Sequence, residues 1–358
     1  MLKFKIIFKK NLYNFFLTLS LILFFFSTDK IHAKSFNINN IEISEPFELD
    51  FDKNDVMIRG FKKGYFELIQ QIVTSVDQTK VNQITLNELK EMIETFSIKE
   101  EKFIDELYYV NFDVSFNKKK LLNYLEKKNV FPSIPLKKKI FFIPIIIDEN
   151  KKELLIFSNN EIFSRWNLSK ESYHLLEYIL PTEDLEDINK IKSQFEFIED
   201  YNFNEITKKY NLEDSIITLI FINNQNIRLL SKILLNNELV LKNKLFSNHD
   251  LNNDDDVKKI IHEMKTIYED YWKNFNLINT SIKLPINIKI NTKFVKKISN
   301  FEEALEEMDL IYNFNIQKFD KNFIYYRVIF NNTPNYFLKL MENQNFNFDT
   351  QNNVWILK

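Results

Sequence analysis

The chain has 358 residues and nearly balanced charge, with 48 Lys and Arg against 50 Asp and Glu, but it contains no Cys and two Gly. The absence of Cys excludes disulfides, a thiolate nucleophile, and zinc or iron–sulfur sites built on Cys. The two glycines, Gly60 and Gly64, cannot form a phosphate-binding loop or a dinucleotide fingerprint. We therefore expect no cofactor, while the length suffices for two or three hydrophobic cores.

A basic head and an apolar stretch open the chain. Four Lys fall within the first ten residues, Leu12 to Phe26 is largely apolar, and Ala33 is a small residue at which a signal peptidase could cut. The apolar stretch, about 15 residues, is shorter than the roughly 20 that span a bilayer. The pattern predicts a cleaved Sec-type signal peptide over residues 1–33 and a periplasmic location. The alternative is an uncleaved inner-membrane anchor over residues 12–27.

The charge of the remaining chain limits its partners. Cleavage after Ala33 would remove five Lys and one Asp, which leaves 43 basic and 49 acidic side chains and a net charge of −6. A mildly acidic chain with interspersed charges has no basic face for nucleic acid or anionic lipid. We therefore expect no nucleic-acid partner, and membrane contact only through an uncleaved signal peptide.

Residues 34–130 are predicted to form a small α+β module. Phe36 to Ile43 alternates apolar and polar side chains, as in a strand with one buried face. Apolar residues then recur every three or four positions from Asp55 to Val76, which predicts an amphipathic helix. Gly60 and Gly64 lie one turn apart on this helix, where small residues let it approach a sheet closely. Further along we expect a helix over 86–95, strands over 96–103 and 107–116, and a helix over 118–128.

Residues 131–276 are predicted to form a central α/β domain with a mixed sheet. The runs Phe141–Ile147 and Ile216–Ile222 are continuously apolar, which is typical of strands buried on both faces of a parallel sheet. The pairs Asn223-Asn224 and Asn236-Asn237 favour tight turns, so the sheet should end in antiparallel hairpins. The expected helices lie near 185–191, 203–210 and 257–275, the last being the longest.

Residues 277–358 are predicted to form a second α+β module. The expected elements are strand 282–290, helix 300–308, strands 310–319 and 323–330, helix 335–343 and strand 353–357. This is the βαββαβ order of a ferredoxin-like sandwich.

The first and last modules share a sequence pattern. Tyr109–Asn117 ends in Phe-Asn and precedes a helix, and Tyr325–Asn331 does the same. The apolar positions that follow are Leu121, Leu122, Leu125 and Val130 in one case and Phe337, Leu338, Met341 and Phe346 in the other. Duplication and convergence on one supersecondary unit are both compatible with this pattern.

Several short segments carry a family resemblance. They are Phe112–Phe116 with the helix at Leu121-Leu122, Pro144, Trp166, Pro181–Asp187 and Trp355–Leu357. Taken in order, they resemble a family of exported bacterial proteins known as a domain of unknown function, number two thousand and sixty-six. The family's small residues along the first helix are mostly Lys, Phe and Ile here. Because that family has no established activity, the resemblance implies export and a fold but no catalytic residue.

The best prediction for a pocket lies in the central domain. Asp184 and Asp187 fall in the first turn of a helix that follows a predicted strand end, and ligands of α/β sheets bind at the carboxyl ends of strands. We combine them with Arg165 and Trp166 as a candidate pocket. The alternative is that the acids only cap the helix. No residue is predicted to be catalytic or to bind a metal.

Two other features have a simpler structural explanation. His174, His249 and His262 show no metal-ligand spacing, and His262 falls on the polar side of its helix. Asp250–Asp256 resembles a calcium loop, but Asp255 occupies the position of the turn glycine and Ile261 that of the bidentate Glu. We interpret this segment as the start of a helix.

Two functions remain open. The first is a non-enzymatic envelope scaffold or adaptor that binds other proteins through sheet edges or helix grooves. It predicts exposed apolar surface along an uncovered sheet edge. The second is a periplasmic ligand-binding protein or hydrolase, which requires a deep pocket uniting Arg165, Trp166 and Asp184 or Asp187.

Overall fold

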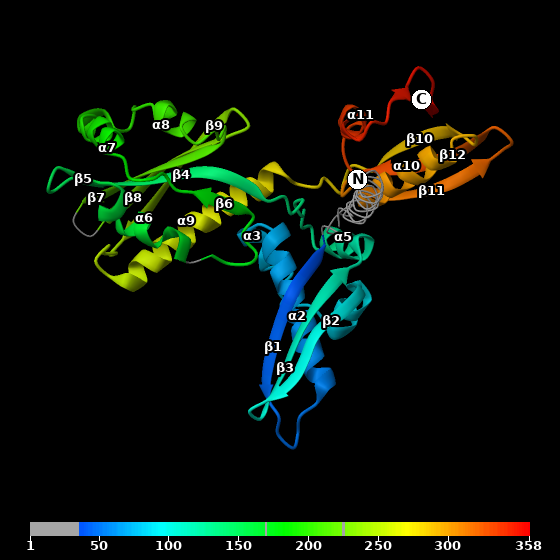
Figure 1. Ribbon diagram of the computed structural model, residues 1–358, viewed down its shortest axis with the longest axis horizontal. Helices are drawn as coiled ribbons and strands as arrows, with labels where there is room; N and C mark the ends of the chain where they lie inside the picture. The colour runs from blue at the N-terminus through cyan, green and yellow to red at the C-terminus, as the bar shows by residue number, and fades with distance from the viewer. Residues whose placement is uncertain (1–35, 169, 224–225) are drawn as a thin grey trace, which may run out of the picture. The chain divides into compact units, whose positions relative to one another are not determined.

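The computed structural model describes residues 36–168, 170–223 and 226–358. They belong to one compact unit with three β-sheets and a mixture of helices and strands (Figure 1). The predicted mixed α/β and α+β class is confirmed. Over these residues, no helix is both long and apolar enough to cross a membrane. The predicted signal peptide lies outside the described residues, and the domain boundaries after 33, 130 and 276 stay predictions.

The first module holds a three-stranded antiparallel sheet in the order β1-β3-β2. Its elements are β1 (Asn37–Pro46), α2 (Lys53–Ile72), α3 (Ser75–Gln78), α4 (Leu86–Met92), β2 (Ile93–Ile104), β3 (Leu107–Phe116) and α5 (Lys118–Lys127). Side chains of β3 alternate between buried and half-buried, because α2 covers one face of the sheet. The order is the predicted one except for the additional short helix α3, and α4 ends at Met92, three residues before the predicted position.

The glycines of α2 permit the predicted close approach of helix and sheet. A Cβ on Gly60 would lie 2.3 Å from Cζ of Phe112 on β3, and one on Gly64 would lie 2.6 Å from Cδ1 of Ile41 on β1. The predicted extension of this helix to Val76 is wrong. The helix ends at Ile72, and Val76 lies exposed on the short helix α3.

The central sheet has the order β5-β4-β7-β8-β9, and β6 also pairs with β4. Its strands are β4 (Lys138–Asp148), β5 (Glu153–Leu155), β6 (Leu176–Ile179), β7 (Ser215–Asn223), β8 (Asn226–Leu235) and β9 (Glu238–Ser247). Strands β6 and β7 run parallel to β4, whereas β7, β8 and β9 are successively antiparallel. The predicted mixed sheet with terminal hairpins is thus confirmed.

Helices cover both faces of this sheet. They are α6 (Glu161–Arg165), α7 (Leu185–Lys192), α8 (Asn204–Lys208) and α9 (Asp254–Phe275), with single 3₁₀ turns at Phe157–Asn159, Trp166–Leu168 and Phe195–Phe197. Figure 1 shows α9 on one side of the sheet and α7 and α8 on the other. The neighbours Phe141 and Phe142 belong to different hydrophobic clusters, one on each side. Strand β4 is therefore buried on both faces, as its apolar run predicts.

Asparagine residues adopt the left-handed backbone conformation, with positive φ, that glycine usually adopts. Seven of the eleven non-glycine residues with positive φ in the described chain are Asn. Asn236 and Asn237, at φ 48° and 66°, form the tight turn between β8 and β9 that the sequence predicts. The other predicted turn includes Asn224, which lies outside the described residues, although Asn223 and Asn226 pair across the β7–β8 hairpin.

The third sheet has the order β11-β12-β10-β14-β13. Its module consists of β10 (Leu284–Asn291), α10 (Val295–Glu307), β11 (Ile311–Phe319), β12 (Phe323–Phe330), α11 (Pro334–Asn343), β13 (Phe348–Asp349) and β14 (Trp355–Leu357). Strand β14 runs parallel to β10, while β12 is antiparallel to both β10 and β11. This is the ferredoxin-like arrangement with β13 added at the edge. Helix α10 begins five residues before the predicted position.

Two linkers meet where the central domain joins the other modules. Ser133 and Leu277 form an isolated antiparallel bridge. The amide of Ile134 donates to the carbonyl of Asn276 at 3.0 Å, and the amide of Ile278 donates to that of Pro132 at 2.7 Å. The chain therefore enters and leaves the central domain through one paired segment.

The first and third modules are also in contact. Nζ of Lys118 on α5 donates to the carbonyl of Met308 at 2.8 Å, and the Tyr312 hydroxyl donates to Oδ1 of Asn123 at 2.8 Å. One hydrophobic cluster includes buried residues of both modules.

Candidate functional site

Arg165 and Trp166 lie at the end of α6, which Asn160 starts by accepting hydrogen bonds from the amides of Ile162 and Phe163. The Arg165 guanidinium binds Glu161 in its own helix at 2.9 Å and Asp254 at the start of α9 at 2.7 Å. Trp166 is fully buried on the α9 side of the sheet. Arg165 and Trp166 thus serve packing and helix pairing.

Asp184 and Asp187 lie on the other side of the sheet. The Asp184 carboxylate accepts hydrogen bonds from the amides of Glu186 and Asp187, and these bonds lower its pKa. The buried Asp187 pairs with Nζ of Lys209 at 2.7 Å. Helix α7 packs Ile188 and Ile191 into the hydrophobic cluster on the face of the sheet opposite α9.

The four predicted pocket residues therefore do not come together. Trp166 packs on one face of the sheet, whereas α7, which carries Asp184 and Asp187, packs on the other. The sequence places Asp184 and Asp187 after a strand end but does not indicate on which face of the sheet each helix packs. The alternative explanation, that Asp184 caps its helix, agrees with the hydrogen bonds that its carboxylate accepts from the first amides of α7.

The histidines occupy three separate environments. His174 accepts a hydrogen bond at Nδ1 from the amide of Glu171 at 3.4 Å, and burial together with nearby Lys265 and Lys273 lowers its pKa to about 4. His249 contacts the carbonyl of Ser247, and His262 is exposed on α9. Throughout the described residues, no group of three or more His, Asp and Glu is arranged to hold a metal ion.

The acidic segment at 250–256 begins α9. Oδ1 of Asn253 accepts hydrogen bonds from the amides of Asp255 and Asp256, and three Asp fill the first turn. These carboxylates face the positive end of the helix dipole. The interpretation of this segment as a helix start is confirmed.

Helix α9 carries a row of buried charged residues that the sequence pattern did not identify. Lys265, Glu269 and Lys273 recur every four residues within the apolar stripe, and all three are buried. Lys265 donates to the carbonyl of Trp166 at 2.7 Å, and Glu269 accepts from the amides of Leu175 and Leu176. Burial lowers the pKa of Lys265 to about 8 and raises that of Glu269. The four-residue spacing was the signal that could have identified them.

The last member of this row ties the central domain to the first module. Nζ of Lys273 donates to the carbonyls of Gln70 and Val73 at the end of α2, and the neighbouring Asp270 accepts from the amide and hydroxyl of Ser75. A cation at the carboxyl end of a helix satisfies its terminal carbonyls. Lys265, Glu269 and Lys273 therefore stabilise the fold by binding backbone groups of neighbouring segments.

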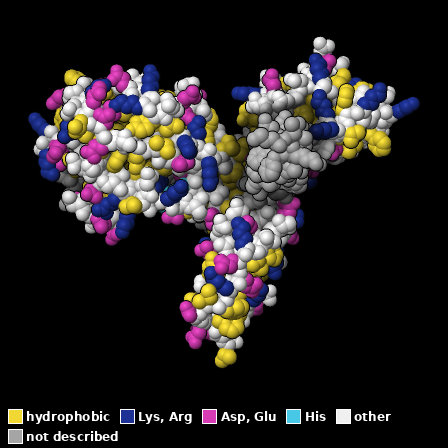
Figure 2. All heavy atoms as spheres, in the orientation of Figure 1, with side chains coloured by type: hydrophobic (Ala, Val, Ile, Leu, Met, Phe, Trp, Pro, Cys, Tyr) yellow, Lys and Arg dark blue, Asp and Glu magenta, His cyan; other side chains and the backbone are white. Residues whose placement is uncertain are grey.

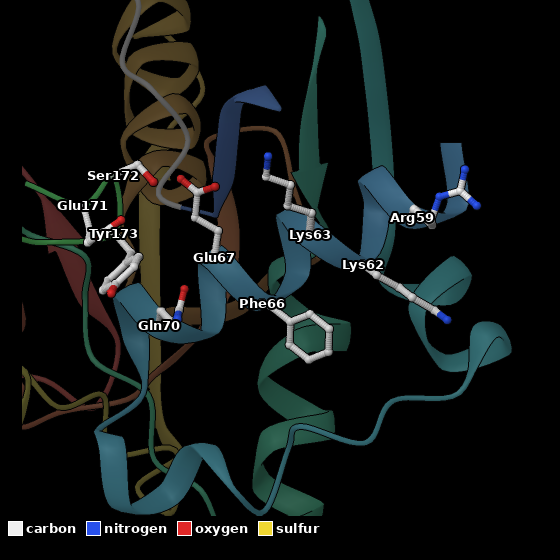
Figure 3. Close-up of a pocket in the computed structure, with 9 residues that line it drawn as sticks. All are labelled: Arg59, Lys62, Lys63, Phe66, Glu67, Gln70, Glu171, Ser172 and Tyr173. Carbon is white, nitrogen blue, oxygen red and sulfur yellow. The ribbon is translucent and has the colours of Figure 1, made fainter. Parts of the chain in front are cut away.

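A groove of about 510 Å³ runs between α2 and the segment before β6 (Figure 3). Figure 3 shows Arg59 and Lys62 pointing away from the side formed by Glu171, Ser172 and Tyr173. Arg59 also pairs with Glu45 on β1 at 3.0 Å. The groups that line the groove do not converge on one point, so the groove lacks the arrangement that catalysis requires.

The most distinctive surface is the outer edge of β9. This strand pairs with β8 over its whole length without a register shift, and no strand of the described chain pairs with its other side. Leu239, Leu241 and Leu245 are 62%, 56% and 61% exposed. They alternate along the strand, so their side chains share one face of the sheet. A long, regular edge with exposed leucines is rare in soluble proteins because it invites pairing with another chain.

The two-residue turn determines which backbone groups of β9 face outward. Leu235 and Glu238 close this turn, and the closing pair of a two-residue hairpin exchanges both of its hydrogen bonds. Hydrogen-bonded pairs then alternate along the ladder. Leu239, Leu241, Asn243 and Leu245 consequently point their N–H and C=O groups away from β8.

No family model matches the sequence, and no curated protein matches it. The resemblance to the exported family of unknown function therefore stays a prediction.

Proposed function

We propose that this chain is an exported, non-enzymatic adaptor that binds an envelope protein by adding a strand of that protein to β9. The observation that carries the proposal is the outer edge of β9, where four alternate residues turn their backbone groups outward and three of them expose leucine. Strand addition uses such an edge for affinity and alternate side chains for specificity.

The backbone would supply much of the binding. Four residues offer four N–H and four C=O groups, and each hydrogen bond formed on association contributes about 0.5–1.5 kcal/mol net. The register also specifies the partner, since the leucine row needs apolar side chains at alternate positions of the incoming strand.

Charge near the edge disfavours basic partners. Lys242 and Lys244 alternate with the leucines and lie on the α9 side of β9, where Lys244 pairs with Glu263. On the leucine side, Arg228 and Lys232 of β8 both contact Glu199. A partner strand with acidic or neutral polar side chains opposite the lysines therefore fits this edge.

The alternative function has less support. A ligand-binding protein or hydrolase would need a pocket that unites Arg165 or Trp166 with Asp184 or Asp187, and these residues contact different faces of the central sheet. Membership of the exported family of unknown function would agree with the adaptor proposal and would add no activity to it.

A proline variant tests the role of the edge. Asn243→Pro removes an outward N–H but no hydrogen bond to β8, whereas Asn243→Ala keeps the N–H and serves as the matched control. The full chain carries a photo-crosslinking amino acid at position 241, or at the exposed Leu185 of α7 as a position control. We expect a defined adduct with an envelope protein from position 241, retained in Asn243→Ala and lost in Asn243→Pro.

Two results would contradict the proposal. One is an adduct from position 241 that persists in Asn243→Pro. The other is the same set of adducts from positions 241 and 185, since that outcome reports diffusion rather than docking. Far-UV circular dichroism and a thermal melt establish that each variant folds.

A further inference from the structure

The first and third modules have equivalent ends with opposite charge. In the first module the loop after β1 meets the β2–β3 turn, where the amide of Phe47 donates to the carbonyl of Glu106 at 2.7 Å. In the third module the loop after β10 meets the β11–β12 turn, where the amide of Thr292 donates to the carbonyl of Asn322 at 2.9 Å. We call residues 47–52 and 103–107 the N tip, and residues 292–297 and 316–322 the C tip.

The N tip is apolar and acidic. Its five acidic side chains are Glu48, Asp50, Asp52, Asp105 and Glu106, and it contains no Lys or Arg. All five are exposed, and none forms an ion pair with another described residue. Phe47, Leu49 and Phe103 are exposed beside them, and Phe47 and Phe103 pack edge to face at 5.0 Å.

The loop of the N tip is also hollowed. Residues 47–51 line a concavity of about 760 Å³. Figure 2 shows hydrophobic side chains at the end of the first module, with acidic side chains close by. A concave apolar surface rimmed by carboxylates suits an apolar side chain flanked by cations.

The C tip has that composition. Its cations are Lys293, Lys296, Lys297, Lys318 and Lys321, against one acid, Asp320. Phe294, Val295 and Phe319 are exposed between them, the last two at 73% and 76%. Asp320 is already engaged, since its carboxylate accepts hydrogen bonds from the amides of Asn322 and Phe323.

We propose that the N tip of one molecule binds the C tip of a second copy of this chain. The two surfaces carry five negative charges and a net of four positive charges, and each exposes aromatic and aliphatic side chains at its centre. Opposite charges steer the encounter and fix the orientation, while burial of the apolar side chains supplies affinity. This contact uses neither edge of the central sheet and is independent of the adaptor proposal.

A pair joined by this contact leaves one free tip on each molecule. Because the two surfaces differ, the contact is heterologous and repeats from copy to copy, closing into a ring or extending as a filament. An anionic lipid surface is a poorer occupant for the N tip, since five carboxylates repel it.

Charge reversal in both tips tests the proposal. The mature chain is studied by sedimentation velocity up to about 1 mM, with the N-tip variant E48K/D50K/E106K and the C-tip variant K293E/K318E/K321E. Wild type should assemble, and its assembly should weaken when salt rises from about 0.05 M to about 0.5 M. Each variant alone should be monomeric, and an equimolar mixture should assemble again, because each reversed tip then faces its complement.

Leu49→Ser tests the apolar part and leaves all charges in place. We expect at least tenfold weaker assembly, whereas Leu185→Ser, a control at another exposed leucine on α7, should assemble as wild type does. Wild type that stays monomeric over this range would overturn the proposal, as would assembly that survives reversal of either tip or a mixture that fails to restore it. Asn243→Pro should assemble normally, which separates this contact from the proposed β9 partner.

Discussion

The first and third modules follow the same plan until the point where a fourth strand is needed. Both place their first three strands in the order first-third-second, with the third strand antiparallel to both neighbours. In the third module β14 then pairs with β10 and covers its outer side. In the first module the chain leaves α5 for the central domain, and β1 keeps an open side.

The open side of β1 is protected in another way. Nζ of Lys63 on α2 donates to the carbonyl of Glu42 at 3.0 Å, and Arg59 pairs with Glu45. A register shift near Asn40 also bends the strand. Charged side chains and bulges are common means of preventing edge pairing. Comparison of the two modules shows that side chains of a neighbouring helix can protect a strand edge that lacks a partner strand.

The modules also end their last helices identically. The amide of Val130 donates to the carbonyl of Leu125 at 3.0 Å after α5, and the amide of Phe346 donates to that of Met341 at 2.9 Å after α11. This is a Schellman motif, and the residue with positive φ is Asn in both cases. The spacing matches the sequence pattern shared by the two modules, while duplication and convergence both stay open.

The largest expected difference between the modules comes from one buried position in each. Phe337→Ala should cost about 3–5 kcal/mol, because the ring packs against Phe330 and against Trp355 of the fourth strand, β14. Its counterpart Leu121→Ala should cost about 2–4 kcal/mol, since no fourth strand depends on it. Urea unfolding of both variants measures the difference. A larger loss for Leu121→Ala would contradict this view of the modules.

The helix packed on each sheet gives the next comparison. Gly60→Ala should lose about 1–3 kcal/mol, because the new Cβ would overlap the Phe112 ring. Ala304 of α10 is buried in the core of the third module, so Ala304→Gly should lose about 1–2 kcal/mol through lower helix propensity and the loss of a buried methyl group. Adding Phe112→Leu to Gly60→Ala should recover part of the loss. Strictly additive effects of these two substitutions in a double-mutant cycle would rule out the overlap.

The two Schellman residues should behave alike. Asn129→Ala and Asn345→Ala should each lose about 1–2 kcal/mol, because alanine in the left-handed region clashes with its own backbone. Asn→Gly at the same positions should be neutral or slightly stabilising. Thermal melts compare the four variants, and tolerance of alanine at either position would count against the assigned motif.

An effect confined to high pH is expected where the two modules touch. Burial lowers the pKa of Lys118 to about 8, whereas an unfolded Lys titrates near 10.4. Between these values the unfolded chain holds more protons, so the contribution of Lys118 to stability rises with pH from about 8 to about 10.4 and is constant below. The stability difference between wild type and Lys118→Met, measured in urea across this range, should follow that course. A difference independent of pH would contradict the lowered pKa of Lys118 in the folded chain.

Local patterns predicted the element order well but failed where distant residues intervene. Two local patterns were informative, the apolar runs of β4 and β7 and the glycines of α2, because the residues themselves indicate how these elements pack. The end of α2 was missed because Lys273, far along the chain, binds its last carbonyls. The start of α10 was missed because Phe294 offers no side-chain cap.

The candidate site was predicted less well than the fold. The sequence pattern placed Asp184 near a strand end but did not indicate which face of the sheet Asp184 and Trp166 would each contact. The exposure of β9 depends on which strand lies at the edge, and strand order is a property of the whole sheet. The expectation of exposed apolar surface at an open edge was general, and the choice of β9 required the structure.

The bridge between Ser133 and Leu277 has a consequence for how this chain could change over time. Because the two crossings into the central domain are paired side by side, the whole domain can be lost, gained or exchanged without separating the modules on either side. If the central domain were lost, the two flanking modules could be joined directly near Ser133 and Leu277 and would remain one chain. Such an exchange would remove Asp270 and Lys273 of α9, so a replacement domain would have to supply new partners for Ser75 and for the last carbonyls of α2.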